Sequence, residues 1–233
     1  MWYNYSYKPR KARDPSAQIA KLRKKNPNIK PVEITGKLAK TWWAQAWNRN
    51  LESYSDYSNR IGRGRSYVKS GAVLDLSISP GKVCALVQGS RVKPYDITVK
   101  IDPLPEKKWI AITQRCSHKI ADLEELATGM FPQEFMELFT NKGDGLFPSP
   151  KEIHFSCSCP DWASMCKHIA AVLYGIGARF DEDPTLFFQL RNIEFSELLK
   201  KSVEEKMDSM LKNAGKTTSR TMQDVDTYEL FGV

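Results

Sequence analysis

The chain has 233 residues, of which 41% are apolar and 27% are charged, and its formal net charge is +8. This is a globular composition, and the chain is long enough to bury a core in one large domain or two small ones without disulfides. No apolar run approaches the roughly 18 residues of a membrane span, and residues 1–5 lack the apolar core of a signal peptide. A secreted protein and a membrane protein are therefore not expected, and the expected location is cytoplasmic.

The positive charge is concentrated in the first half of the chain. Residues 1–120 hold 24 basic and 8 acidic side chains, a net charge of +16, whereas residues 121–233 hold 11 basic and 19 acidic ones, a net charge of −8. Such asymmetry favours a polyanion as the partner of the first half. The alternative is a solvated basic segment that only keeps the protein soluble.

Residues 1–36 are predicted to form a basic, flexible arm. Within it, residues 16–25 have the spacing of a short basic helix, which the following prolines end. The arm contributes three candidate nucleic-acid contacts, Arg10, Lys11 and Arg13. A further helix is predicted over residues 37–52, because apolar residues and three tryptophans recur there near helical spacing.

Residues 59–65 are predicted to form a basic, glycine-rich loop. Its two glycines would let the backbone approach a phosphate group closely, and its arginines would bind that phosphate. The candidate nucleic-acid contacts here are Arg60, Arg63 and Arg65. The alternative is a solvated loop with no partner.

The next segment is predicted to be a three-stranded antiparallel meander with one buried face, because apolar and polar residues alternate along it. The strands are expected at residues 74–78, 83–87 and 95–101. Residues 79–82 join the first two, with Pro and Gly at the central positions of a type II turn. A basic loop joins the second and third strands and adds two candidate nucleic-acid contacts, Arg91 and Lys93.

Most of the remaining chain is predicted to be helical. Helices are expected over residues 105–116, 120–127, 132–140 and 196–211, with another that starts at Pro184. Residues 213–223 have the composition of a flexible linker. The last ten residues end in an acidic and hydrophobic tip, where Leu230 and Phe231 are candidates to insert into a partner's pocket; the alternative is a frayed terminus.

Five cysteines in a chain without a secretion signal favour metal binding or burial over disulfides. Three of them follow the pattern Cys157-x-Cys159, six residues, Cys166-x-His168. On an extended strand the first two share one face, and the last two begin an apolar helical segment whose N-terminus favours thiolate. Three thiolates and one imidazole form a closed tetrahedral set, which suits one structural Zn²⁺ ion.

Four other residues of these types are set aside. His154 points to the opposite strand face by parity. Cys116 and His118 repeat the Cys-x-His spacing without a second Cys-x-Cys pair, which indicates an ordinary half-buried pair. Cys84 lies inside the meander and is expected to be a small apolar filler.

The cysteine and histidine pattern resembles the SWIM-type zinc finger, a motif of chromatin-remodelling ATPases and transposases. The likeness to small prokaryotic SWIM proteins covers roughly residues 40–195, with supporting strings such as Trp42-Trp43 and Phe180–Pro184. All four zinc positions of that family are present here. The resemblance implies a small strand-strand-helix finger, DNA or protein binding, and work with a Swi/Snf-type helicase-like ATPase. No DNA contact transfers by motif.

The sequence therefore predicts an α+β protein, with an antiparallel β-meander, packed helices and a small zinc finger. Four regions are expected: a basic arm at 1–36, an α+β region at 37–145, the finger and C-terminal helices at 146–212, and a linker and tail at 213–233.

The leading hypothesis for function is a zinc-binding, non-enzymatic, DNA-binding accessory protein of a Swi/Snf-type helicase-like ATPase. No catalytic motif is present; Gly215-Lys216-Thr217 resembles only the end of a P-loop, because Met210 stands where its first glycine belongs. Neither a membrane nor a small-molecule substrate is expected. The alternative is a protein-interaction adaptor without direct nucleic-acid contact, in which the finger is a structural docking element.

Overall fold

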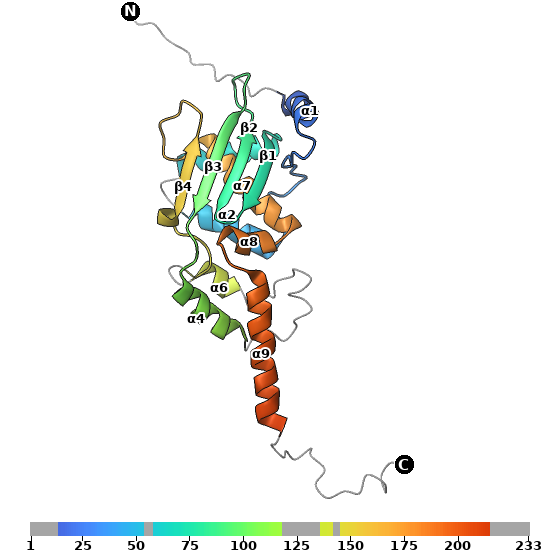
Figure 1. The fold of residues 1–233 in the computed structure, drawn as a ribbon. Helices are drawn as coiled ribbons and strands as arrows, with labels where there is room; N and C mark the ends of the chain where they lie inside the picture. Colours follow the sequence, from blue (N-terminus) through green and yellow to red (C-terminus); the bar gives the residue numbers. More distant parts are fainter. Residues whose placement is uncertain (1–13, 54–57, 118–135, 142–144, 215–233) are drawn as a thin grey trace, which may run out of the picture.

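A computed structural model describes residues 14–53, 58–117, 136–141 and 145–214 of the chain (Figure 1). Its four-stranded antiparallel sheet has the order β1-β2-β3-β4. The strands are β1 (Val73–Ser79), β2 (Lys82–Val87), β3 (Tyr95–Ile101) and β4 (Ile153–Cys157). The helices are α1 (Pro15–Lys25), α2 (Trp42–Glu52), α3 (Ser58–Lys69), α4 (Glu106–Ser117), α6 (Met136–Thr140), α7 (Lys167–Glu182), α8 (Thr185–Leu190) and α9 (Phe195–Ala214), with a 3₁₀ turn at Pro150–Glu152. The expected α+β class is confirmed.

The meander forms as expected from the alternation of apolar and polar residues. On β3, Tyr95, Ile97, Val99 and Ile101 are buried, while Asp96 and Lys100 between them are exposed. The turn between β1 and β2 places Gly81 at a φ of +64°, the left-handed conformation that a type II turn requires at this position. One face of the sheet therefore belongs to the core and the other carries polar side chains.

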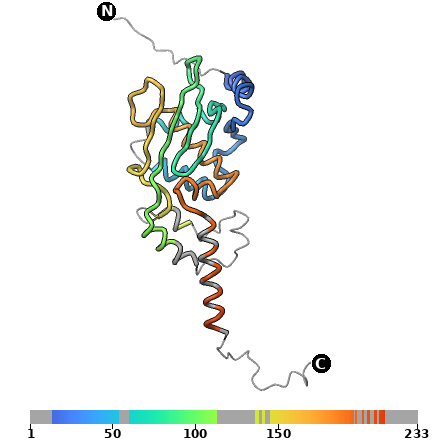
Figure 2. The backbone as a smooth tube through the Cα atoms, in the orientation of Figure 1, coloured from blue at the N-terminus to red at the C-terminus, as the bar shows by residue number. Residues whose placement is uncertain are grey.

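Helix α7 is the centre of the hydrophobic core. Twelve of its sixteen residues are buried, because it packs against the sheet on one side and against α2 and α3 on the other. The indole N–H of Trp47 on α2 donates a hydrogen bond to the Leu173 carbonyl of α7, 3.0 Å away. Helix α9, by contrast, extends away from the sheet at the end opposite to α1 (Figure 2).

The prediction of a loop over residues 59–65 is wrong, since these residues belong to helix α3. Gly64 is needed there for a tertiary contact rather than for flexibility. A Cβ atom added at Gly64 would lie 2.4 Å from the Cβ of Ala170 on α7, so only glycine lets the two helices approach this closely. The arginines of this segment are therefore held on a rigid helix that is packed against the core.

The segment that carries the cysteine and histidine pattern is integrated into the sheet. The resemblance implied two strands and a helix of its own, but the described residues form one strand, β4, which pairs with β3. The domain boundary expected near residue 146 therefore separates two strands, β3 and β4, that are paired in one sheet. No local sequence pattern specifies this pairing, because the partner strand lies more than fifty residues earlier in the chain.

The second half of the expected flexible arm is attached to the sheet. The Val32 amide donates to the Val73 carbonyl and the Leu76 amide donates to the Lys30 carbonyl, both over 3.0 Å. Val32 is buried in the core. Residues 30–32 thus run alongside β1, and α1 is held close to that edge of the sheet (Figure 1).

The expected helices at 37–52, 105–116 and 196–211 and the helix near Pro184 are confirmed, with ends shifted by a few residues. The predicted helix at 120–127 lies outside the described residues, as does the first part of the one at 132–140. The same holds for Arg10, Lys11, Arg13, Leu230 and Phe231. No helix in the described part of the chain combines the length and apolar composition that crossing a membrane requires.

Replacing Gly64 by alanine is expected to destabilise the protein by about 1–3 kcal/mol, as overpacking of a core does. The matched control is Gly62→Ala on the same helix, where no heavy atom lies within 4 Å of the added Cβ. This control should leave the stability unchanged or raise it by up to about 1 kcal/mol through helix propensity. Urea denaturation measures both changes, and equal stability of the two variants would contradict the close packing of α3 on α7.

Candidate metal centre

The structure brings together the four side chains of the Cys-x-Cys and Cys-x-His pattern. Cys157 is the last residue of β4 and Cys159 follows it, while Cys166 is the N-cap of α7 and His168 lies in its first turn. Their ligand atoms all lie within 4.8 Å of one another. The strand end and the helix start therefore present one group of three sulfurs and one ring nitrogen that can hold a metal ion.

The cluster is shielded on its helix side. Cys166 and His168 are buried, with exposed fractions of 1% and 4%, and Cys157 and Cys159 are half-buried. The Sγ atom of Cys166 lies 3.6 Å from Nδ1 of His168, so Nδ1 is the ring nitrogen that faces the sulfurs. This donor set is typical of a structural site, because three thiolates and an imidazole complete a tetrahedron.

The His168 ring is fixed by two tyrosines. Its centroid lies 5.3 Å from that of Tyr67 on α3 and 4.6 Å from that of Tyr95 on β3. Its Nε2 atom points away from the sulfurs, is buried and has no hydrogen-bond partner among the described residues. A Cβ atom added at Gly89 would lie 2.4 Å from Cε2 of Tyr95 and 3.1 Å from Nε2 of His168, so glycine at this position makes room for both rings.

Without a metal ion, the pKa values of the three cysteine thiols are shifted in different directions. The pKa of Cys166 is lowered to about 4, chiefly because the Cys157 thiol donates a hydrogen bond to it, with His168 and the Ile169 amide adding to the effect. The pKa of Cys157 is raised by the same hydrogen bond and by burial. Burial also raises the pKa of Cys159. A metal ion would have to displace the protons that these two thiols retain.

The excluded histidine lies where strand parity predicts it. His154 is exposed on the polar face of β4, and its Nε2 atom lies 3.0 Å from Oδ1 of Asp102, away from the cluster. The expectation for Cys84 is wrong, because it lies on the exposed face of β2 rather than in the core. The side chains of Cys116 and His118 lie outside the described residues.

Two of the candidate nucleic-acid arginines bind other parts of the protein. Arg60 lies 3.3 Å from Asp161 in the segment between Cys159 and Cys166, which connects α3 to the metal centre. Arg65 lies 2.6 Å from Glu52, and its Nε atom donates to the Tyr174 hydroxyl at 2.8 Å. Sequence reasoning missed these acidic partners because they lie on other elements: Asp161 is 101 residues from Arg60, and Glu52 ends the preceding helix α2.

The other described candidates are exposed. Arg63 lies on the outer side of α3, and Arg91 and Lys93 lie on the β2–β3 loop. This loop is held from inside by the buried side chain of Gln88, whose amide donates to the carbonyls of Gly89 and Arg91 at 2.9 and 2.8 Å. The metal centre and the basic loop are neighbours, because His168 packs against Gly89 at the base of that loop.

Trp162 is a feature that the sequence analysis did not single out. It lies between the second and third cysteines and is fully exposed, with a relative exposure of 101%. The sequence could have indicated its exposure, because the six residues between Cys159 and Cys166 are too few to form a core that would bury a tryptophan.

Comparison with known proteins gives a sequence relative without a described activity. The chain is 37% identical over 172 residues to the uncharacterized protein Rv2102 of Mycobacterium tuberculosis, a match that includes 73% of this chain. The chain spans 62% of the length of that relative. No protein-family model and no solved structure matches the chain.

The metal centre predicts a specific loss of bound metal. Cys157→Ser and Cys166→Ser should each lower the metal content from about one ion per chain and destabilise residues 150–180, because the site energy of a structural zinc is on the order of 10 kcal/mol. Elemental analysis with urea denaturation measures both effects. Cys84→Ser is the matched control, since this exposed thiol lies outside the cluster. Wild-type protein without stoichiometric metal would contradict the site.

Proposed function

We propose that the metal is a structural Zn²⁺ ion and that the chain is not an enzyme. The donor set supports this proposal, because three sulfurs and one imidazole satisfy the four coordination positions of zinc. No position then remains for a water molecule or substrate, which a catalytic zinc site needs. Zinc would supply folding energy at the junction of β4 and α7.

We further propose that the protein is a DNA-binding accessory factor. One observation carries this proposal: exposed basic side chains gather at the end of the sheet where the metal centre lies. The strand register places the end of β2, the start of β3 and the end of β4 at this edge. Arg91 and Lys93 are exposed on the β2–β3 loop, and the basic helix α1 lies beside it (Figure 1). Phosphate contacts by such residues are largely independent of base sequence.

The proposed partner protein is a Swi/Snf-type helicase-like ATPase. This step rests on the resemblance of the Cys157, Cys159, Cys166 and His168 pattern to SWIM-type fingers of small prokaryotic proteins. In such an assembly the ATPase would act on DNA and this chain would hold the DNA or the motor.

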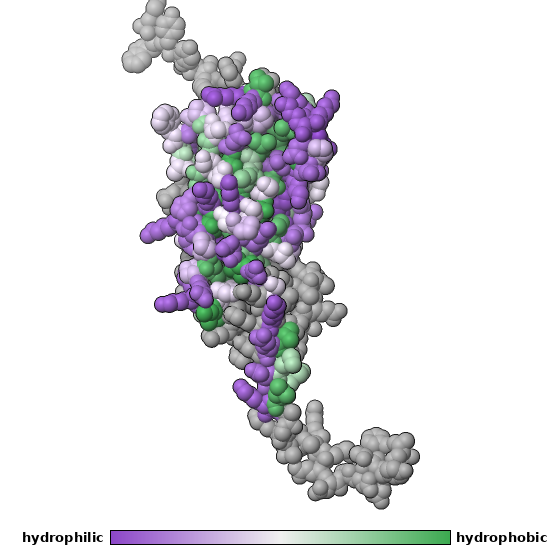
Figure 3. Space-filling model, in the orientation of Figure 1, coloured by the Kyte–Doolittle hydropathy of each residue, from purple (hydrophilic) through white to green (hydrophobic). Residues whose placement is uncertain are grey.

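A second candidate is a protein-interaction adaptor, and two exposed apolar features favour it. Trp162 is fully exposed beside the metal centre. Helix α9 carries an exposed apolar stripe, visible along one side of it in Figure 3 and formed by Val203, Met207, Met210 and Leu211. Large exposed apolar groups of this kind are typical of protein contacts. Leu230 and Phe231 would insert into a pocket of such a partner, a proposal that rests on sequence alone.

The salt dependence of DNA binding separates the two candidates. If about six phosphates are neutralised, the logarithm of the association constant should fall with the logarithm of salt concentration at a slope near −5. Fluorescence anisotropy with duplex and single-stranded DNA at several salt concentrations measures this slope. A flat response, or no binding of either DNA at low salt, would contradict DNA binding and leave the adaptor as the supported function.

A further inference from the structure

Helix α1 has no fully buried side chain, although Gln18, Ile19 and Leu22 are half-buried. It contains Lys21, Arg23, Lys24 and Lys25 and no acidic residue. Most helices of globular proteins are stabilised by an apolar face against the core, and like charges four positions apart destabilise a helix. Lys21 and Lys25 form such a like-charge pair. The apolar packing of α1 is partial, and no acidic side chain within the helix offsets its positive charge, whereas a bound polyanion would neutralise it.

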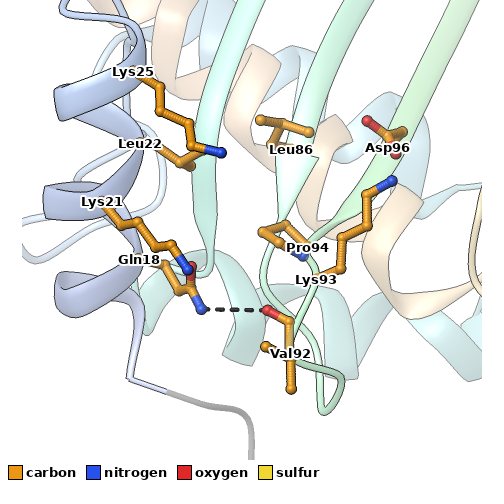
Figure 4. Close-up of a pocket in the computed structure, with 9 residues that line it drawn as sticks. All are labelled: Gln18, Lys21, Leu22, Lys25, Leu86, Val92, Lys93, Pro94 and Asp96. Atoms are coloured by element: carbon orange, nitrogen blue, oxygen red, sulfur yellow. Dashed lines mark hydrogen bonds between the residues drawn. The ribbon is translucent and has the colours of Figure 1, made fainter.

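A groove lies between α1 and the β2–β3 loop (Figure 4). It has a volume of about 470 Å³. Its lining is formed by Gln18, Lys21, Leu22, Lys25, Leu86, Val92, Lys93, Pro94 and Asp96. The ammonium groups of Lys21 and Lys25 point from α1 toward the sheet in this view. The floor is apolar, and three lysines against one aspartate make the groove basic.

The groove is fixed on both sides. The side-chain amide of Gln18 on α1 donates to the Val92 carbonyl of the loop, 3.3 Å away. The loop itself is held by the two hydrogen bonds of the buried Gln88 amide. A site whose walls are already in place loses less entropy when it binds a ligand.

We propose that this groove binds the backbone of a single strand of nucleic acid. Lys21, Lys25 and Lys93 would contact the phosphate of the nucleotide in the groove and those on either side of it, while its sugar lies on the apolar floor. The volume is that of a small-ligand site, which has room for a nucleotide-sized group and not for a duplex. The proposal rests on the proposed nucleic-acid function. It adds a binding site, a single-stranded ligand, and two lysines, Lys21 and Lys25, that the sequence did not indicate as nucleic-acid contacts.

Another basic depression has less capacity for an anion. It has a volume of about 450 Å³ and is lined in part by Lys37, Arg49, Arg65 and Lys69. Its Arg65 is already paired with Glu52, which lines the same depression. No ion pair joins the groove lysines Lys21, Lys25 and Lys93 to an acidic group of the described residues.

The test compares two triple variants of the full-length, zinc-loaded protein. One carries Lys21→Gln, Lys25→Gln and Lys93→Gln; the matched control carries Lys37→Gln, Lys69→Gln and Lys151→Gln, which are exposed lysines away from the groove. The probe is a labelled oligothymidylate of about 20 nucleotides, long enough for a site of this class. The groove variant should bind at least about 10-fold more weakly, and its salt slope should fall by about 2 because three phosphate contacts are lost. The control should change by less than about 3-fold.

Three outcomes would overturn the groove assignment. The first is equal weakening of both variants, which would indicate only net charge. The second is tighter binding of a duplex than of the single strand. The third is displacement of the strand by thymidine monophosphate or polyglutamate at equal anion concentration. If wild-type protein binds neither DNA form at low salt, the proposed function itself fails, and this result is distinct from the other three.

Discussion

The junction between β4 and α7 is the constraint on which the rest of the structure depends. Cys157 ends a strand at the edge of the sheet, and Cys166 caps the helix that forms the centre of the core. The Cys₃His cluster joins these two points, so one bound ion would fix where α7 enters the core and how β4 adds to the sheet. Because α7 contacts α2, α3 and the sheet, a displacement of α7 at this junction would change its packing against all of these elements. The metal centre is therefore a part of the core and not a separate module.

A continuous series of contacts connects the metal centre to the basic end of the sheet. His168 packs against Tyr95 and Gly89, which flank the β2–β3 loop. Gln88 holds that loop from inside, and the loop in turn accepts a hydrogen bond from Gln18 on α1. A bound ion would thus support the position of the residues proposed to bind phosphate, although the cluster lies in the acidic half of the chain. In this arrangement a structural ion would contribute to the proposed nucleic-acid binding without contacting the nucleic acid.

Local patterns were sufficient for some features and insufficient for others. The four residues of the candidate metal centre were predicted because strand parity and the helix start place them on facing surfaces, and the same parity excluded His154. The helix over residues 59–65 was not predicted, because its two glycines favour a loop locally, while the contact of Gly64 with Ala170 stabilises a helix. The pairing of β4 with β3 and the groove beside α1 join segments far apart in sequence. Such contacts depend on tertiary packing, which periodicity and spacing do not report.

The central claim is that the metal ion holds the β4–α7 junction and, through His168, the base of the β2–β3 loop. Hydrogen-exchange mass spectrometry of the full chain before and after removal of the metal by a chelator tests this claim most directly. The account predicts faster exchange in β4, the first turns of α7 and residues 88–95, with little change in α4 and α9. Unchanged exchange at the junction, or an increase confined to α4 and α9, would contradict it.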